Sequence, residues 1–596
     1  GAGLSLDGGT LRTTADVTTA RAAELGAGGG TFETASGTIF TQNGVIGGAG
    51  SLTKIGAGTM VTTAGNVYAG DTTVAEGTLR AGATDTFSPN SGFVVGPAGT
   101  LDLAGFGQTI AALTNGGAVR IGGAPGTDLT VAGDYVGEGG TIFFNTRIGD
   151  DSSISDRMLI DGGRASGSSL ITVINVGGAG ARTTGDGILL IDAVNGATTA
   201  ADAFALGAPV VAGPYEYSLY RGGLSGGSPN DWFLRTILDC DLPAFADVCD
   251  DGVSPVPPPT PPHYRPETSV DTAIPSLALD YGNELIASLD QRMGGRRSFR
   301  TGGRFGEEHR ADQLAWGRIV GLTGSRDGGA LGIYGDDGPS YDYDMFALQT
   351  GMDLYRAEHA DGSFDNAGLY VAYGHAGADV DHFDGTDAGT NNLDAWTLGG
   401  YWTHFGATGW YIDGVVQGTW YDVAASGRLP GLHTDGFGFG ASLEGGYPFR
   451  FDNGIVLEPQ AQLTYQAIHL DDARDIGARI RFDNVQSLVG RLGVRLSRSW
   501  DLNAAATDAS EQRQAVAWMR ASLVNEFLGR PETSFSSEDG YVPFQADKRG
   551  AGLKIDAGFD AEVARDISVY GNIEFQHKFD GGGHAFGGEL GLKIRF

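Results

Sequence analysis

Apolar and polar side chains alternate along the second half of the chain, most clearly in its last segment, residues 584–596. One face of that segment carries Phe586, Leu590, Leu592, Ile594 and Phe596, and the other carries Glu589, Lys593 and Arg595. A period of two residues is that of a β-strand, whose successive side chains point to opposite faces. From Leu314 onward there are about twelve such segments of roughly ten or more residues. Their approximate cores are 314–326, 341–354, 367–378, 393–404, 410–422, 435–447, 455–468, 484–499, 515–527, 549–563, 567–579 and 584–596.

This series of segments predicts a closed antiparallel barrel. An even number of strands is typical of single-chain transmembrane barrels, which expose apolar side chains to lipid and turn charged ones toward a polar lumen. Some connectors are short, such as 405–409, and others are long and acidic, such as 379–392 and 530–548. Tryptophans lie near strand ends, where interfacial girdles are expected: Trp316, Trp396, Trp402, Trp410, Trp420 and Trp500. The alternative is a large soluble antiparallel barrel or sandwich.

The first part of the chain repeats a different unit, in which Gly is followed by Ser or Thr and then by a bulky apolar residue. The unit occurs at Gly30-Thr31-Phe32, Gly37-Thr38-Ile39, Gly50-Ser51-Leu52, Gly58-Thr59-Met60, Gly77-Thr78-Leu79, Gly99-Thr100-Leu101 and Gly140-Thr141-Ile142. Short β patches separated by glycine turns predict a parallel β-helix, in which each rung stacks on the last. A glycine-rich disordered tract is the alternative, but β-branched residues recur too regularly for it.

A proline-rich spacer, 254–262, separates the two parts and predicts an extended connector. After it, apolar residues recur every three or four positions, which is typical of a helix: Val270, Ile274, Leu277, Tyr281, Leu285 and Leu289. From the pattern alone, a surface or interface helix remains an alternative.

Composition excludes some classes of protein. A chain of 596 residues should hold more than one domain. Its net charge of -33 argues against a nucleic-acid partner. The chain has no run of eighteen apolar residues, so the sequence predicts no membrane-spanning helix. Cys240 and Cys249 lie in an acidic connector, where the sequence allows a small disulfide loop in an oxidising compartment. A metal site there is less favoured, because no His adjoins them.

Candidate chemistry is sparse. The segment 223–227 fits the Gly-x-Ser-x-Gly nucleophile elbow, but that motif needs a strand-to-helix turn and triad partners. In a chain with 100 glycines the match is expected by chance. Acidic groups within 336–344 and 379–387 offer oxygen ligands without forming a calcium-binding loop, so solvated loops are the better interpretation. We therefore assign no catalytic, cofactor-binding or metal-binding residue, and we expect neither enzyme activity nor a cofactor.

Three stretches carry a resemblance to a known family. Residues 50–60 with 71–79 resemble the passenger-associated repeat of autotransporters, the type V (type Va) secretion proteins. Residues 99–235 resemble the pertactin-like C-terminal passenger region called the autochaperone, and the resemblance implies a core of Trp232, Phe233 and Leu234. A chain that stops on the last aromatic of a strand resembles the C-terminal signature of bacterial outer-membrane proteins, which implies that Phe596 is an assembly signal.

The resemblance implies an all-β protein in which a right-handed parallel β-helix stem precedes a 12-stranded antiparallel transmembrane β-barrel. In the resembled family the helix threads the lumen and plugs the pore, which gives Val270 to Leu289 a lumenal place. Some relatives cut themselves at paired asparagines in this helix; this chain has only Asn283 there, so self-cleavage is not expected. The predicted domains are 1–98 for the β-helix repeats, 99–238 for the autochaperone region, 239–267 for the linker, 268–293 for the lumenal helix and 304–596 for the barrel.

The function that the resemblance implies is anchoring, export and display of the chain's own passenger at the bacterial surface, as an adhesin or virulence factor. The alternative is a translocator for a protease or esterase located upstream of Gly1, since the chain starts without a leader and we expect a processed or truncated piece. A plain porin is disfavoured by the stem and the helix. The expected partners are outer-membrane lipid and lipopolysaccharide, the β-barrel insertion machinery, periplasmic chaperones and host cells or matrix. We expect a monomer with its barrel in the outer membrane.

Overall fold

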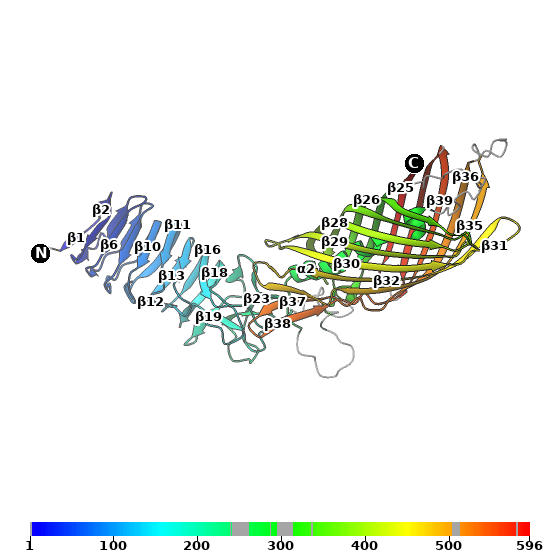
Figure 1. Ribbon diagram of the computed structural model, residues 1–596. Helices are drawn as coiled ribbons and strands as arrows, with labels where there is room; N and C mark the ends of the chain where they lie inside the picture. The colour runs from blue at the N-terminus through cyan, green and yellow to red at the C-terminus, as the bar shows by residue number, and fades with distance from the viewer. Residues whose placement is uncertain are drawn as a thin grey trace. The chain divides into compact units, whose positions relative to one another are not determined.

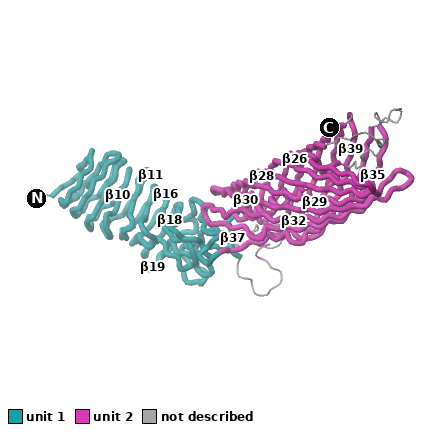
Figure 2. Tube along the Cα trace, viewed as in Figure 1, with its two compact units in different colours: residues 1–242, 251–265, 536–540 teal, residues 243–250, 266–535, 541–596 magenta. Residues whose placement is uncertain are grey.

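The computed structural model describes most of the chain, namely residues 3–238, 240, 249, 261–286, 288–294, 314–334, 338–502, 513–564, 566–579 and 582–596. Two compact units make it up (Figure 2). Unit 1 comprises residues 1–242, 251–265 and 536–540, and unit 2 comprises residues 243–250, 266–535 and 541–596. The predicted proline-rich spacer, 254–262, and the predicted start of the barrel at 304 lie largely or wholly outside the described residues.

Unit 1 is built from short strands that follow one another along the chain (Figure 1). They are β1 (Leu4–Leu6), β2 (Gly9–Thr13), β3 (Val17–Thr19), β4 (Ala23–Leu25), β5 (Gly30–Thr34), β6 (Ile39–Gln42), β7 (Ile46–Gly48), β8 (Leu52–Ile55), β9 (Thr59–Thr62), β10 (Thr72–Ala81), β11 (Gly92–Asp102), β12 (Gln108–Ile110), β13 (Ala112–Asn115), β14 (Ala118–Arg120), β15 (Asp128–Val131), β16 (Tyr135–Thr146), β17 (Arg157–Asp161), β18 (Arg164–Asn175), β19 (Ile188–Val194), β20 (Thr198–Thr199), β21 (Phe204–Leu206), β22 (Val210–Ala212), β23 (Tyr215–Arg221) and β24 (Trp232–Arg235).

These strands stack in parallel as a β-helix. One sheet runs β2-β5-β8-β10-β11-β13-β16-β18-β20, each strand paired in parallel with the next rung. A column of directly paired, buried side chains runs through it: Phe40, Met60, Leu79, Leu101, Val119, Ile142 and Ile171. Most of these are the apolar residues of the Gly-Thr-apolar unit, so the predicted β-helix is confirmed. At Gly37-Thr38-Ile39 the column takes Phe40 instead, and Ile39 faces outward.

The glycine of the unit is needed where two rungs approach each other. A Cβ on Gly99 would lie 2.0 Å from the carbonyl oxygen of Val74, and one on Gly58 would lie 2.2 Å from that of Ala35. Gly77 also has a φ of +69°, a conformation that side chains rarely adopt. Rung stacking therefore explains why the repeat begins with glycine.

The C-terminal end of unit 1 changes from parallel to antiparallel pairing. Strand β24 pairs antiparallel with both β19 and β23, and β23 pairs with β22. All four residues of β24 are buried. The indole of Trp232 packs edge-on against Phe204 at 5.4 Å and donates a hydrogen bond to the Thr199 hydroxyl at 3.1 Å. This antiparallel cap covers the last rungs of the β-helix, where an uncovered core would otherwise meet water.

Asp156 lies fully buried among the rungs and makes the stem's stability depend on pH. Its carboxylate accepts hydrogen bonds from the backbone N–H groups of Gly126, Thr127 and Asn145 at 3.2, 3.1 and 2.8 Å. Burial outweighs these bonds and raises the pKa of Asp156 to about 6. Between about pH 4 and pH 6 the folded stem binds more protons than the unfolded chain, so stability falls as pH rises through this window.

We expect the stem to lose up to about 3 kcal/mol from this one group between about pH 4 and pH 7. Urea unfolding of the wild type and of Asp156→Asn, followed by circular dichroism at both pH values, isolates the effect, because the amide does not titrate. The variant loses one acceptor for N–H groups, so its absolute stability is lower. A pH dependence that is the same in both proteins would contradict the assignment.

Unit 2 contains the long strands of the barrel (Figure 1). They are β25 (Leu314–Arg326), β26 (Ser340–Glu358), β27 (Phe364–Asp381), β28 (Asp387–Phe405), β29 (Tyr411–Gly427), β30 (His433–Gly446), β32 (Ile455–Leu470), β35 (Gln486–Asp501), β36 (Gln514–Glu526), β39 (Gly550–Ala564), β40 (Ile567–Lys578) and β41 (His584–Arg595), with the short β31 (Phe449–Arg450) beside β32. A further small sheet has the order β33-β34-β37-β38, formed by β33 (Ala473–Arg474), β34 (Arg479–Asp483), β37 (Glu532–Ser537) and β38 (Gly540–Gln545). The remaining elements are α2 (Glu267–Ile286), α3 (Leu289–Met293) and the 3-10 turn η2 (Gly328–Leu331).

Within the described residues, twelve of these strands close into an antiparallel ring. Neighbours along the chain pair from β25 to β30, β30 pairs with β32, and the last strand, β41, pairs with the first, β25. Hydrogen bonding to both neighbours leaves none of the twelve as an open edge, which a membrane requires. The twelve predicted segments are therefore confirmed, with bounds close to those of the structure.

The two faces of the ring differ as the alternation predicts. On β41, Leu590 is 57% exposed on the outer face, whereas Glu589 is 8% exposed on the inner face. An apolar outer face and a polar inner face are what a transmembrane barrel presents to lipid and lumen.

Two expectations about the barrel are wrong. Trp316 is 2% exposed and packs inside the lumen against Tyr370 and Tyr401, because it is one of the alternate residues of β25 whose side chains point inward. It is not part of an outer girdle, unlike the exposed Trp396 and Trp420. The acidic connector at 379–392 is mostly strand, since β27 runs to Asp381 and β28 begins at Asp387. Acidic side chains mask the strand pattern there because these strand ends extend beyond the apolar band.

Candidate functional site in the barrel lumen

Helix α2 lies inside the ring of strands. Most of its side chains are buried, the polar Thr268, Ser269 and Asp271 as well as Leu277, and Asp280, Asn283 and Glu284 are half-buried. It packs mainly on β26 to β30 and β32. A helix on the outer surface would keep one face exposed, so that alternative is excluded. The apolar positions Val270, Ile274, Leu277, Tyr281, Leu285 and Leu289 are all buried.

Inward-pointing side chains of the strands hold the helix backbone. Asn391 donates to the carbonyl of Val270 at 2.8 Å, Gln466 to that of Leu279 at 3.2 Å, and Arg318 to that of Leu285 at 3.2 Å. Close approach needs a glycine at position 282, where a Cβ would lie 1.9 Å from the amide oxygen of Gln466. The polar side chains of the barrel wall thus bind the backbone of a helix that carries both apolar and polar side chains.

The helix runs along the barrel. Near its start, the Ser269 hydroxyl lies 2.7 Å from Nδ1 of His382, in the turn that joins β27 to β28. Beyond its end, Leu289 packs with Phe405 and Tyr411, at the opposite ends of β28 and β29. We call the end with the β27–β28 turn, where α2 begins, the outer end, and the end where β41 stops the inner end.

The structure has two helices where the periodicity predicts one. Ser288 caps α3, accepting from the N–H of Gln291, and the Gln291 side chain accepts from the N–H of Ser288. This reciprocal arrangement is a capping box, which starts a new helix. The Ser-x-x-Gln spacing of residues 288–291 is the sequence signal for this second helix. The apolar periodicity runs through it and so predicts a single helix.

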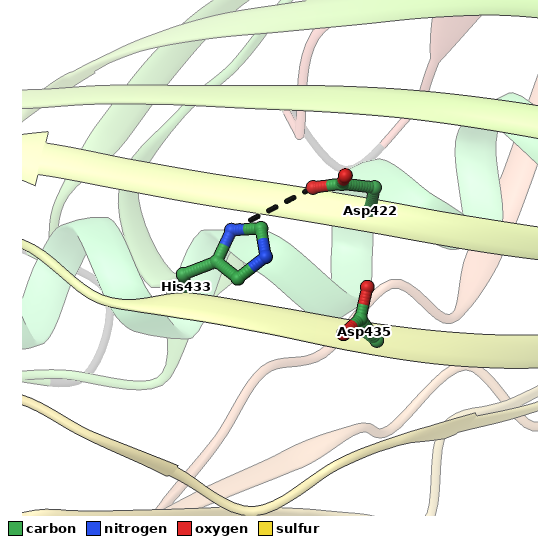
Figure 3. A group of neighbouring side chains, drawn as sticks. All are labelled: Asp422, His433 and Asp435. Carbon is green, nitrogen blue, oxygen red and sulfur yellow. Dashed lines mark ion pairs between the residues drawn. The ribbon is translucent and has the colours of Figure 1, made fainter.

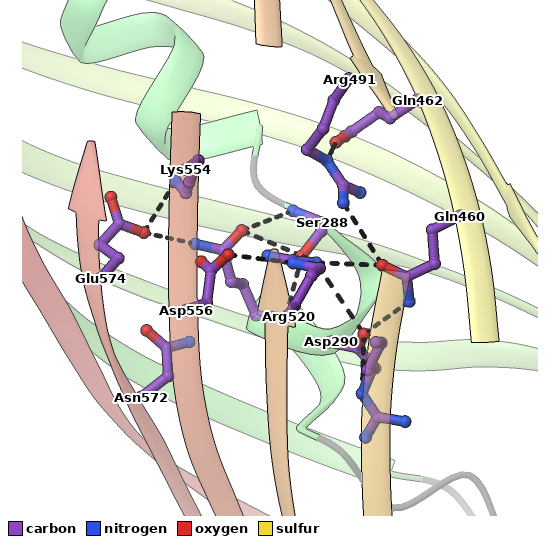
Figure 4. Close-up of polar contacts among 12 residues, drawn as sticks. Ser288, Asp290, Gln460, Gln462, Arg491, Arg520, Lys554, Asp556, Asn572 and Glu574 are labelled. Carbon is purple, nitrogen blue, oxygen red and sulfur yellow. Dashed lines mark hydrogen bonds and ion pairs between the residues drawn. The ribbon is translucent and has the colours of Figure 1, made fainter. Parts of the chain in front are cut away.

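Charged side chains fill the lumen around both helices (Figure 4). Asp280 pairs with Lys548 at 2.8 Å and with Arg326 at 3.2 Å. Asp290 lies 3.3 Å from Arg495 and 3.9 Å from Arg520. Arg520 also pairs with Asp556 at 3.0 Å, and Lys554 with Glu574 at 2.8 Å. Removing one partner of a buried pair typically costs about 3–5 kcal/mol, so the network fixes the helices in one register.

Glu589 and Lys593, which the alternation assigns to a polar lumen, take part in ion pairs of the same kind. Arg491 pairs with Glu444 at 3.3 Å, Arg318 with Glu589, and Lys593 with Asp560. The sequence could not supply the other half of the network, because Asp280, Asp290 and Arg292 look like ordinary solvent-exposed helix positions until the helix is placed inside a barrel.

A cavity of about 180 Å³ remains beside the helices. It is lined by α2 at Asn283 and Glu284, by α3 at Gln291, and by strands on the side of the barrel that includes β25, β36, β39 and β40. Its position follows from the placement of α2, which packs on the other side of the ring.

Two candidates from the sequence lie outside the lumen, and each has an ordinary structural role. Ser225 lies in the turn between β23 and β24, bonded to Asp186 at 2.8 Å, and not at a strand-to-helix elbow. Cys240 and Cys249 are both disulfide-bonded. Among the described residues, neither α2 nor α3 combines the length and apolarity of a membrane-crossing helix.

One cluster of metal-ligand type was missed by the sequence, because it spans two strands (Figure 3). Asp422 on β29 and His433 and Asp435 on β30 have ligand atoms within 4.8 Å of one another, and His433 lies 3.6 Å from Asp422. All three are exposed on the outer face. Exposed carboxylates are common without an ion, so the cluster by itself assigns no function.

Two family models match separate parts of this chain. The family model described as Autotransporter beta-domain matches residues 315–574, and the model described as Autochaperone Domain Type 1 matches residues 115–219. Among solved structures, the transport unit of the autotransporter AIDA-I from Escherichia coli covers 56% of this chain and 100% of its own, with a TM-score of 0.44 and 19% identity.

Curated relatives match the same regions. The Adhesin BmaC autotransporter of Brucella suis biovar 1 (strain 1330) is 31% identical over 100% of this chain and 17% of its own length. The Autotransporter adhesin AIDA-I of Escherichia coli is 26% identical over 79% of this chain and 34% of its own length. The chain therefore spans well under two thirds of either relative. With its autochaperone and barrel matches in the predicted order, the chain belongs to the autotransporters, with a barrel in the outer membrane and a passenger displayed at the cell surface.

Proposed function

We propose that the displayed passenger is an adhesin and not an enzyme. The observation that supports this proposal is the match of the whole chain to an autotransporter named as an adhesin. The stem adds physical support, since a β-helix presents long, flat, regularly spaced faces suited to extended contact with another surface. Host cells or extracellular matrix are the proposed partners on the outside. Outer-membrane lipid and lipopolysaccharide, the barrel insertion machinery and periplasmic chaperones are the proposed partners during assembly.

Display and adhesion are separated by one experiment in a non-adherent bacterial host. An epitope placed before Gly1 reports display, through antibody binding to intact cells and its loss after protease treatment. Adhesion is counted as bacteria retained on matrix-coated surfaces and on epithelial monolayers. The matched control lacks residues 3–98 and keeps the autochaperone region and barrel.

We expect cells that display the full chain to be retained several-fold more than the control. Normal display of both proteins with equal retention would overturn the adhesin proposal for this part of the protein. Absence of the epitope from the surface would instead contradict the display of the passenger.

A further inference from the structure

The outer end of the barrel carries its longer connectors. Residues 471–485, which include β33 and β34, join β32 to β35 there, and residues 527–549, which include β37 and β38, join β36 to β39. At the inner end the turns 359–363 and 406–410 are short. Transmembrane barrels have short turns in the periplasm and longer loops outside the cell, so the outer end lies at the outer leaflet of the membrane.

Exposed aromatic side chains mark the outer boundary of the apolar band on three neighbouring strands. Trp396 on β28, Trp420 on β29 and Phe437 on β30 are paired directly from strand to strand and are 61%, 52% and 44% exposed. The rings of Trp420 and Phe437 lie 5.3 Å apart. Aromatic rings at the edge of an apolar band sit at the headgroup level of a membrane. The outer face of these strands therefore meets lipid headgroups at this level.

Two positions beyond each of these aromatic residues, toward the outer end, the same face carries an aspartate. Asp394, Asp422 and Asp435 lie directly opposite one another across β28, β29 and β30. All three are exposed. A strand rises about 3.3 Å per residue, so the carboxylates lie about 7 Å along the strand beyond the rings. The first polar side chains beyond the aromatic boundary are thus three neighbouring carboxylates.

This row of carboxylates is not neutralised by the chain. Like charges directly opposite each other in a sheet are destabilising. His375 lies 3.2 Å from Asp394. His433 lies 3.6 Å from Asp422. In the part of the chain that the structure describes, no Lys or Arg forms an ion pair with any of the three aspartates, and the Asp435 carboxylate accepts no hydrogen bond. A cation from outside the chain would remove the repulsion.

Two of the aspartates and one histidine are arranged to hold such a cation (Figure 3). Ligand atoms of Asp422, His433 and Asp435 all lie within 4.8 Å of one another. Carboxylate oxygens and an imidazole nitrogen are ligands for divalent ions from Ca²⁺ to Zn²⁺. The three residues share one exposed surface of the sheet, so an ion that they hold keeps open coordination positions on its outward side. Those positions face the lipid headgroups.

We propose that Asp422, His433 and Asp435 bind a divalent cation that also binds a phosphate of the glycolipid in the outer leaflet. The chemistry of lipopolysaccharide fits this surface. Its phosphates take the open coordination positions of the ion, and the aromatic rings beside the site contact the boundary between its sugars and its acyl chains. Without an ion, the phosphates and the aspartates repel each other. The site belongs to the barrel and does not depend on what the passenger binds.

Calorimetric titration of the folded full chain in detergent, with Ca²⁺ and with Zn²⁺, tests the ion site. Asp435→Asn and His433→Ala each remove one ligand from an exposed position. Asp452→Asn is the matched control, because Asp452 is an exposed carboxylate in the turn between β31 and β32 at the inner end. Heat-modifiable mobility in gels shows that each barrel is folded.

We expect the wild type and Asp452→Asn to bind at least one of the two ions with equal affinity, and Asp435→Asn and His433→Ala to bind it several-fold more weakly. Absence of binding to the wild type would overturn the site. Equal affinity in all four proteins would place the bound ion elsewhere and would overturn it as well.

Urea unfolding in lipid vesicles tests the lipid partner. Phosphatidylcholine vesicles with and without lipopolysaccharide are compared, each with the ion that binds or with EDTA. We expect the ion to raise the urea midpoint of the wild type more when lipopolysaccharide is present, and EDTA or Asp435→Asn to abolish this difference. A third sample has inorganic phosphate in place of lipopolysaccharide.

The outcomes separate the ion from its lipid partner. An ion effect of the same size with and without lipopolysaccharide would overturn the bridge to lipid. An equal effect of inorganic phosphate would show that the site takes a free phosphate and would also overturn the lipid assignment. Equal stabilisation of the wild type and Asp435→Asn by lipopolysaccharide would place the lipid contact elsewhere on the barrel and overturn the proposal.

Discussion

Replacing Trp232 by alanine is expected to leave the barrel inserted while the passenger appears slowly at the surface and becomes sensitive to protease. The indole is 4% exposed, packs against Phe204 and donates to Thr199, so its removal leaves a cavity in the cap and takes one hydrogen bond from the Thr199 hydroxyl. Truncating a buried Trp costs about 3–5 kcal/mol, a large fraction of the 5–15 kcal/mol that stabilises a typical domain. The rungs behind the cap would then lose the folded end on which they stack.

The measurement is the time course of passenger exposure on intact cells, together with its resistance to added protease. Leu224→Ala is the matched control, because Leu224 lies in the neighbouring turn and is 58% exposed. We expect the control to behave as the wild type. If Trp232→Ala reached the surface at the wild-type rate and resisted protease equally well, the cap would be an ordinary spacer.

Local patterns determine most of the backbone of this protein, because each pattern reports one steric requirement. Alternation gives the twelve barrel strands, since lipid and lumen select opposite side chains on opposite faces. The Gly-Thr-apolar unit gives the β-helix, since the apolar residue enters the core column and the glycine permits close rung contact. In the barrel strands and in the β-helix alike, the sequence alone specifies the strand and which of its faces is buried.

The lumen could not be predicted in the same way, because it depends on which segments meet inside the ring. A tryptophan near a strand end suggests an interfacial girdle, but the alternation of β25 points the side chain of Trp316 into the lumen, and the structure follows the alternation. Asp290 and Arg495 are over two hundred positions apart and form an ion pair only because α3 occupies the barrel. The alternation predicts a polar wall correctly, but it does not reveal that most of this wall is packed against a helix instead of facing water.

A test of the lipid-facing side of the barrel needs an inward-facing control position, and the packing of the lumen limits which position can serve. Asn572 and Gly591 have the inward parity, but neither accepts an arginine cheaply. Asn572 donates to Glu589 at 2.6 Å, and a Cβ on Gly591 would lie 2.2 Å from the ring of Tyr570. Gln576 is the better inward position, since it is only half-buried and lines the cavity.

Arginine in place of Ile573 is therefore expected to destabilise the barrel far more than arginine in place of Gln576, three residues along the same strand, β40. Ile573 is 70% exposed on the outer face near the middle of β40, where a charge that faces hydrocarbon costs about 2–4 kcal/mol. At Gln576 the same charge enters a polar cavity beside Glu574, to which Gln576 already donates at 2.8 Å. Folding titrations in lipid vesicles measure both free energies of unfolding. Equal losses for the two variants would mean that the outer face of β40 does not meet lipid.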